Sequence, residues 1–197
     1  MNIVKISHTE SNKPENYEEM KRFFHKRTSE HIDRVKKYCK KIEDYDPDRF
    51  DGLCDQAKNH DKSKFEDPEY YPYLYVTWSY KCRDLGKKFE YPEEIDKEMN
   101  EATNHHVVNN KHHPEYWSGK KVGLINRKDR DKAPSEMVDA TKMPILSLAE
   151  MVADWLSMSE EKGTSTKTWA DKNVNVRWKF NDNQKDLIYE LIKEVWK

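Results

Sequence analysis

The sequence has little glycine, only three cysteines and no long hydrophobic run. Five glycines in 197 residues argue against a fold rich in β-strands, because such folds use glycine at their turns. The cysteines are widely spaced and form no Cys-x-x-Cys pair, which indicates reduced thiols in a cytoplasmic protein. No stretch approaches the ~20 apolar residues of a membrane span, and the first residues lack the apolar core of a signal peptide. We therefore expect an intracellular protein with no membrane partner.

An excess of one charge is absent as well. The formal net charge is -1, with acidic and basic residues interleaved and no basic arm, so the sequence carries no strong nucleic-acid signal. Several common catalytic strings are also missing, namely the P-loop, G-x-G-x-x-G, H-E-x-x-H and G-x-S-x-G. Nothing in the sequence therefore points to a P-loop NTPase, a dinucleotide-binding enzyme, a zincin or a serine hydrolase.

Apolar periodicity predicts an all-α fold with a single helical domain over residues 15–197. Residues 1–14 read as a polar N-terminal segment or a short strand. Apolar residues at steps of three and four predict a helix from about Pro14 to Ile42. Further helices are expected over 47–66, 70–85, 92–112, from about 134, and over 145–163, 166–173 and 181–196, with a charged surface loop over 118–133.

Four features of this helical pattern suggest chemistry. They are His31 in an apolar stripe, the doublet His60-Asp61, the cluster His105, His106, His112 and His113, and Asp154 in the apolar run MVADWLSM. Each alone has an ordinary explanation, such as a hydrogen-bonded core histidine, so the prediction depends on their conjunction. Imidazole and carboxylate groups that converge from different helices suit a divalent metal ion. Buried charge without such a partner is costly.

The order His31, His60-Asp61, Asp154 resembles the HD superfamily of metal-dependent phosphohydrolases. The string HDKSKF is similar to the HD-x-x-K form of that superfamily, and ADWLS to the helix that supplies its last aspartate. The resemblance implies an HD-type helical bundle whose metal ligands are His31, His60, Asp61 and Asp154. The strings HDKSKF, HHVVNNKHHPEYW and EMVADWLSMSEEKG also resemble an uncharacterised domain family of bacteria and phages. That likeness implies a bacterial or phage-infected host cell.

The histidine cluster would extend this site. Dinuclear HD enzymes carry two further histidines between the doublet and the last aspartate, and by this resemblance we expect His105 and His112 as additional ligands. On one continuous helix, histidines seven residues apart would be separated by ~10 Å, too far to share an ion. Pro114, however, indicates that the helix ends near His112. The alternative is that some of these histidines cap the helix or bind nearby carboxylates.

The resemblance implies hydrolysis of a phosphoester, either a nucleotide or another small molecule, with one or two divalent ions per chain (Mn, Fe, Co, Zn or Mg). Asp61 would orient the attacking water, and His106 would protonate the leaving group. Lys64 would bind phosphate, because on a helix it returns to the side of the doublet.

Two alternatives stay open: an HD-fold di-iron oxygenase, or a non-catalytic, metal-stabilised module that binds a nucleotide or a protein. The aromatic segment from Tyr70 to Trp78 could stack a base, although core packing is its more ordinary role. The sequence leaves the oligomeric state open.

Overall fold

The computed structural model describes residues 14–118, 126 and 134–196, and this part of the chain is mainly helical. Its elements are α1 (Tyr17–Tyr45), α2 (Pro47–Phe50), α3 (Leu53–Ala57), the 3-10 helix η2 (Lys62–Phe65), α4 (Tyr70–Asp84), α5 (Glu93–Asn109), α6 (Pro114–Trp117), β1 (Val138–Asp139), α7 (Ile145–Lys162), α8 (Thr166–Asn173), β2 (Trp178–Lys179) and α9 (Asp182–Val195). The predicted all-α fold is confirmed. None of the helices in the described ranges is both long and apolar enough to span a bilayer. The expected N-terminal segment and surface loop lie largely outside the described residues.

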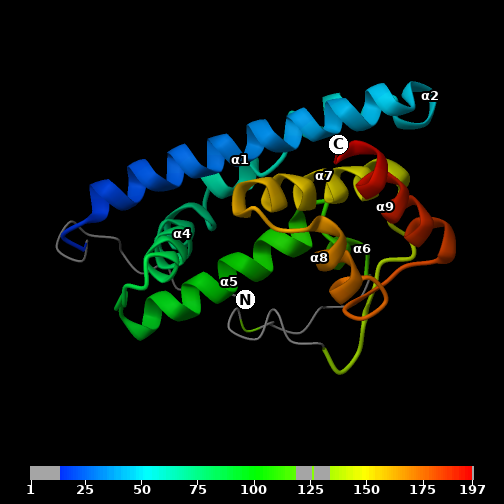
Figure 1. The fold of residues 1–197 in the computed structure, drawn as a ribbon. Helices are drawn as coiled ribbons and strands as arrows, with labels where there is room; N and C mark the ends of the chain where they lie inside the picture. Colours follow the sequence, from blue (N-terminus) through cyan, green and yellow to red (C-terminus); the bar gives the residue numbers. More distant parts are fainter. Residues whose placement is uncertain (1–13, 119–125, 127–133, 197) are drawn as a thin grey trace.

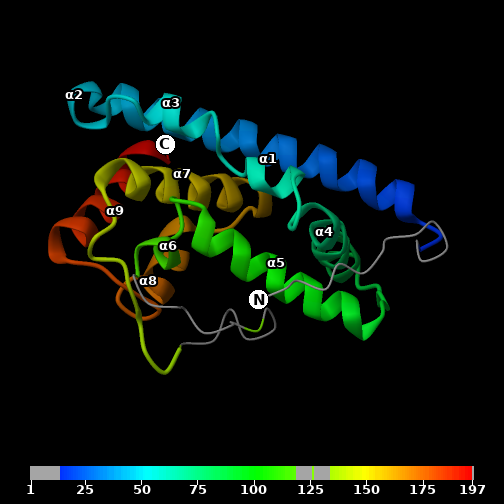
Figure 2. The ribbon, with the colours of Figure 1, turned by 180° about the vertical axis from the view of Figure 1, so that it is seen from behind.

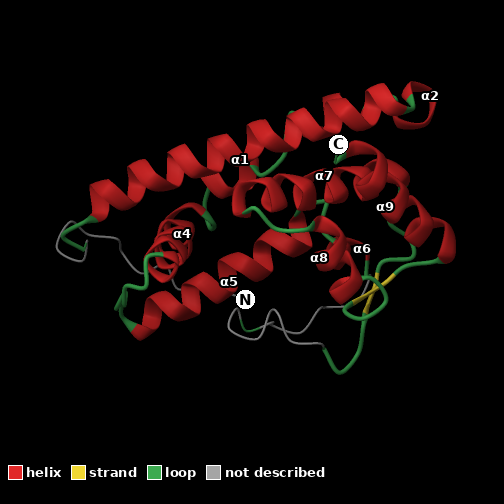
Figure 3. Cartoon of the chain, viewed as in Figure 1, coloured by secondary structure: helices red, strands yellow, loops and turns green. Residues whose placement is uncertain are grey.

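The arrangement is built on two helices that lie along each other. α1 runs the length of the molecule and packs on α7 (Figure 1). α4 packs against α1 and α5 on one side, while α8 and α9 adjoin α7 on the other. Seen from behind, α3 returns along the flank of α1 (Figure 2). β1 and β2 form a short parallel pair near the end of the molecule that carries α8 and α9 (Figure 3). The fold therefore consists of two helical groups that share α1.

The buried stripe of α1 joins two hydrophobic clusters. Met20 and Phe24 belong to a cluster with residues of α4 and α5. Val35 and Ile42 belong to a second cluster with residues of α7 and α9. His31 is buried on the same stripe, between these two pairs of residues. A polar side chain thus lies where the two cores meet, and its loss of hydration must be offset by polar partners.

The continuous helix expected over residues 47–66 is wrong. Gly52 has a φ of 86° and Asp61 a φ of 56°, both in the left-handed region that interrupts an α-helix. The chain instead forms α2, α3 and η2, with His60 and Asp61 in the turn between the last two. Aspartate is one of the few residues other than glycine that visits this conformation. Because of this turn, the side chains of His60 and Asp61 point in other directions than they would on a continuous α-helix.

The helix expected from about residue 134 is also wrong. Residues 135–136 form a bend and β1 follows, pairing in parallel with β2. The N–H groups of Val138 and Ala140 donate to the carbonyls of Arg177 and Lys179, each over 3.0 Å. Backbone groups in this segment are therefore satisfied by a distant part of the chain, a contact that local periodicity does not encode.

Replacing Leu156 with alanine tests the core that holds α7. Leu156 is fully buried in the cluster shared by α1, α7 and α9. Leu156→Ala should lower the free energy of unfolding by about 2–5 kcal/mol, because it removes buried methyl groups and leaves a cavity. Urea denaturation followed by circular dichroism measures the change. Leu85→Ala is the matched control, since Leu85 is 59% exposed. A similar loss in both variants would contradict this assignment of the core.

Candidate metal centre

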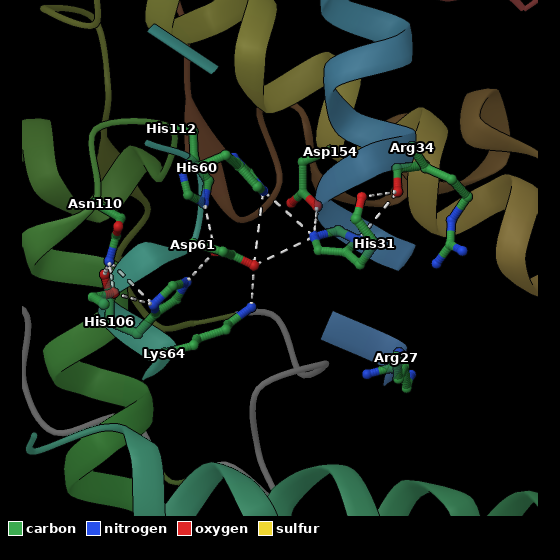
Figure 4. A network of polar contacts seen from close by, with 12 residues as sticks. Arg27, His31, Arg34, His60, Asp61, Lys64, His106, Asn110, His112 and Asp154 are labelled. Carbon is green, nitrogen blue, oxygen red and sulfur yellow. Dashed lines mark hydrogen bonds and ion pairs between the residues drawn. The ribbon is translucent and has the colours of Figure 1, made fainter. Parts of the chain in front are cut away.

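Four side chains from three separate segments of the sequence lie close together between α1 and α7 (Figure 4). His31 comes from α1, His60 and Asp61 from the turn before η2, and Asp154 from α7. Nε2 of His31 lies 3.4 Å from Nε2 of His60, 3.4 Å from Oδ2 of Asp61 and 3.2 Å from Oδ1 of Asp154. Nε2 of His60 lies 3.8 Å from Oδ2 of Asp61. His31, His60 and Asp61 therefore form one group of potential ligands, and Asp154 adjoins it through its contact with His31.

These separations are those of ligands around one ion. For ligands about 2.1 Å from a metal in tetrahedral geometry, the ligand atoms are about 3.4 Å apart. The spacing around Nε2 of His31 is close to that value. Two imidazoles and two carboxylates also form a donor set that suits divalent transition metals. This buried cluster can hold a metal ion.

Three histidines form a second group on the other side of Asp61. His106 comes from α5, and His112 and His113 follow the end of that helix; ligand atoms of the three lie within 4.8 Å of one another. Oδ1 of Asp61 lies 3.1 Å from Nε2 of His106 and 3.6 Å from Nε2 of His112. This oxygen is buried and makes no well-aligned hydrogen bond among the described residues. Asp61 therefore turns one oxygen towards each group.

The separation of ~10 Å expected for histidines seven residues apart on one continuous helix does not apply to this group. α5 ends at Asn109, and the chain then turns back, so the rings of His106 and His113 have centroids 4.9 Å apart. His105, expected as a ligand, lies outside the centre. Its Nδ1 binds Oε1 of Glu69 over 2.7 Å, and its side chain is 38% exposed. His105 precedes His106 by one residue on α5, so its side chain points in a different direction. His113, beyond the end of the helix, completes the group with His106 and His112.

Carboxylates and a hydroxyl orient the imidazoles from behind. Nδ1 of His60 donates to Oε1 of Glu150 over 2.8 Å, and Nδ1 of His112 lies 3.6 Å from the same oxygen. Glu150 also accepts from the side-chain amide of Gln56 over 2.6 Å. The hydrogen bond leaves Nε2 of His60 facing Asp61, the tautomer that a metal requires. Nε2 of His112 also faces Asp61, 3.6 Å from its Oδ1. Glu150 can be grouped with His60 and His112 as a ligand set, but its 2.8 Å contact is a hydrogen-bond length, so we assign it an orienting role.

The Nδ1 atoms of His106 and His31 also have polar partners. Nδ1 of His106 donates to the fully buried Glu69 over 2.8 Å, and Ser63 donates to the same carboxylate over 2.9 Å. Oγ of Ser157 lies 3.1 Å from Nδ1 of His31. Sequence reasoning missed Glu69, Glu150 and Ser157. One signal was available for Glu150, which precedes Asp154 by one helical turn in the same apolar run.

The charges of the centre hold its carboxylates in the ionised form. Burial alone would raise the pKa of Asp61, but the ammonium of Lys64 and the charges of His60 and His106 hold that pKa well below its usual range. Burial would also raise the pKa of Asp154, and the hydrogen bond with His31 lowers it instead. Both carboxylates are therefore available to a cation. Lys64 contacts Oδ2 of Asp61 through the turn of η2, so the expected proximity of Lys64 to the doublet is confirmed, although not by an α-helix.

A pocket leads to the centre from the side of α1, α4 and α5. Its volume is about 150 Å³, and the residues at its inner end include His31, Asp61, His112 and Asp154. Lys64 and Arg27 also line it, and both lie on the same side of Asp61 in Figure 4. A small ligand can therefore reach the cluster.

A model for a family described as "Family of unknown function (DUF5662)" matches residues 20–194. The chain belongs to this family. The matched span contains every residue of the two histidine groups and of their orienting partners, so the centre lies inside the shared domain. No curated protein and no solved structure gives a significant match. The family's description names no activity, and function must be argued from the site.

Replacing Glu150 with glutamine should weaken metal binding at the centre by about 10–100-fold, because His60 loses the carboxylate partner that fixes its tautomer. Titration of the chelator-treated protein with Mn²⁺, followed by calorimetry, measures the affinity. Glu160→Gln is the matched control, on the exposed face of the same helix. Equal affinity in Glu150→Gln and the control would rule out the orienting role.

The pKa values of two imidazoles of the centre are shifted in opposite directions. Burial lowers the pKa of His112 well below 6.5, and the charge of His60 adds to this effect. Burial would lower the pKa of His31 as well, but hydrogen bonds to Asp154 and Asp61 outweigh it and raise the pKa above 6.5. Relative to an ordinary histidine, the neutral form is therefore favoured at His112 and the protonated form at His31.

In the metal-free protein, the free energy of unfolding should be greatest near pH 6.5, the ordinary value for both groups. As the pH falls below this value, the unfolded chain binds a proton at His112 that the folded chain refuses, so stability falls. As the pH rises above it, the stabilisation from protonated His31 decreases until the raised pKa is passed. Urea unfolding from about pH 5 to about pH 8 measures the profile. His112→Gln should flatten the acid side, whereas His25→Gln, at an exposed position, should not.

Proposed function

We propose that this chain is a metal-dependent phosphohydrolase of the HD type, acting on a nucleotide or another small phosphoester. The observation that supports this most directly is the position of Asp61. It lies at the inner end of a pocket, with one oxygen towards His31 and His60 and the other towards His106 and His112. A carboxylate between two imidazole groups suits a centre of one or two divalent ions, such as Mn, Fe, Co, Zn or Mg.

In this proposal the imidazoles and carboxylates bind the metal ions, and Asp61 also orients the attacking water. His31, His60, Asp61 and Asp154 would hold one ion, and His106, His112, His113 and the second oxygen of Asp61 would hold another. A bound divalent ion supplies Lewis acidity and lowers the pKa of water. The second oxygen of Asp61, buried without a well-aligned partner among the described residues, can also accept a hydrogen bond from the attacking water.

Lys64 is the pocket-lining cation nearest the centre. Its ammonium contacts Asp61, and in the presence of substrate it can neutralise charge on the phosphate. The expectation that His106 protonates the leaving group fits the geometry less well, because Nδ1 of His106 is bound to Glu69 and Nε2 faces Asp61. Lys64 can donate that proton instead, since lysine is an established general acid and this one lines the pocket.

The second histidine group also favours a di-iron oxygenase as the competing function. A carboxylate between two imidazole-rich sites is equally suited to two irons that react with oxygen. Iron near two per chain, with oxygen uptake and no phosphate release, would favour that function. A nucleotide recovered intact with the purified protein would instead favour a binding module.

The proposed hydrolysis is tested with the purified protein supplied with Mn²⁺, Co²⁺, Fe²⁺ or Zn²⁺, by screening nucleotides, cyclic nucleotides and generic phosphoesters for phosphate release. Asp61→Ala should abolish activity. Lys64→Met should retain the metal but lower kcat/KM by about 10²-fold, because it removes a charge that stabilises the transition state. Lys62→Met is the matched control, on the same short helix but exposed. Activity that survives in Asp61→Ala would falsify the proposed role of this carboxylate.

A further inference from the structure

The pocket changes character between its inner end and its walls. The inner end is polar and closed, with His31, Asp61 and His112 each less than 10% exposed. The walls are formed by the side chains of Val76, Val107 and Met158 and by the tyrosines Tyr73 and Tyr80. Val76, Tyr73 and Tyr80 lie on one face of α4, at the spacing of successive helical turns. A ligand whose phosphate reaches the centre must therefore place its organic group against a mainly apolar surface.

Two threonines on these walls already have partners within the protein. The hydroxyl of Thr77 donates to the carbonyl of Tyr73 over 2.8 Å, and that of Thr103 donates to the carbonyl of Met99 over 2.7 Å. Each threonine thus uses its proton within its own helix.

Arg27, also on the pocket wall, forms an ion pair within the protein. Its guanidinium donates twice to the carboxylate of Glu161, over 2.8 and 3.2 Å. Recognition of a sugar or a base needs hydrogen-bonding groups placed for the ligand. Thr77 and Thr103 would each have to give up an existing bond to donate to a ligand, and the pair with Glu161 holds the guanidinium of Arg27 in place, with two of its five N–H groups engaged.

The size of the pocket also favours a small ligand. Its volume is about 150 Å³, whereas pockets for drug-sized ligands measure about 300–1,000 Å³. An apolar cavity of about 150 Å³ in another protein holds benzene. The pocket also has to hold the phosphate at its inner end, so it is small for a nucleotide, which adds a base and a sugar to its phosphate. Since the inner end is closed, only one organic substituent on the phosphate can extend towards the opening.

We propose that the ligand of this pocket is a small phosphomonoester with an apolar alkyl or aryl group, and that nucleotides and sugar phosphates are poor ligands. This inference rests on the proposed phosphohydrolase function and selects among its substrates. The phosphate lies at the imidazole and carboxylate centre beside Lys64. The organic group packs against Val76, Val107, Met158 and the two tyrosine rings.

The first experiment compares phenyl phosphate, AMP and ribose 5-phosphate as substrates of the Mn²⁺-loaded protein. We expect kcat/KM for phenyl phosphate to exceed the other two values by about 10-fold or more, the scale on which apolar pockets discriminate. Equal or higher kcat/KM for AMP or ribose 5-phosphate would overturn the proposal, while leaving the hydrolase function intact.

The second experiment measures binding and does not require turnover. By calorimetry, phenylphosphonate should bind the Mn²⁺-loaded protein at least about 10-fold more tightly than ribose 5-phosphate. If no ester is cleaved but this preference is found, the proposed hydrolysis fails and the inference about the pocket holds. If ribose 5-phosphate binds as tightly, the inference fails.

A pair of variants localises the preference to the walls. Met158→Gln keeps the length of the side chain but makes it polar, and it should weaken phenylphosphonate binding by about 5–10-fold with little effect on inorganic phosphate. Met137→Gln is the matched control, because Met137 is 41% exposed and is not among the residues that line the pocket. Circular dichroism verifies that both variants fold. Unchanged phenylphosphonate binding in folded Met158→Gln would contradict the proposed packing.

Discussion

The fold depends on how it neutralises one fully buried carboxylate. Asp61 is 1% exposed, and an isolated charge in such a place would cost more free energy than a domain of this size has to spare. The structure surrounds it with imidazoles from α1 and α5 and from the turns beside η2 and α5, and with the ammonium of Lys64. These elements come from distant parts of the sequence, so the interaction that offsets the burial of Asp61 also joins the two halves of the molecule.

That interaction lies where the two hydrophobic clusters meet. α1 contributes apolar residues to both clusters and places His31 between them. Apolar packing has no directional preference, so by itself it would let the two helical groups slide along α1. Hydrogen bonds and ion pairs are directional, and a network whose partners come from both groups restricts them to one arrangement. The polar seam thus adds specificity to the apolar packing on either side.

The orienting carboxylates give the centre its chemical character. Glu69 and Glu150 bind the Nδ1 atoms of His106 and His60, and Glu150 also lies near His112. With Nδ1 engaged in this way, His60 and His106 each direct Nε2 to the interior, where a metal ion can bind it. These buried residues line one end of a pocket whose walls are mainly apolar. The site therefore has imidazole and carboxylate groups at one end and aliphatic and aromatic side chains along its walls.

Much of this was readable in the sequence. Periodicity determined the long helices α1, α4 and α7, because a helix buries a stripe at steps of three and four whatever it packs against. Residue type and order identified His31, His60, Asp61 and Asp154 as a group, since buried imidazoles and carboxylates need polar partners or a metal ion. Only the tertiary structure decided that Asp61 adopts a left-handed turn, that His113 replaces His105, and that Glu69 and Glu150 orient the imidazoles. Those features depend on side chains from separate helices meeting in space, and a one-dimensional pattern specifies the face of each helix but not the distance between two of them.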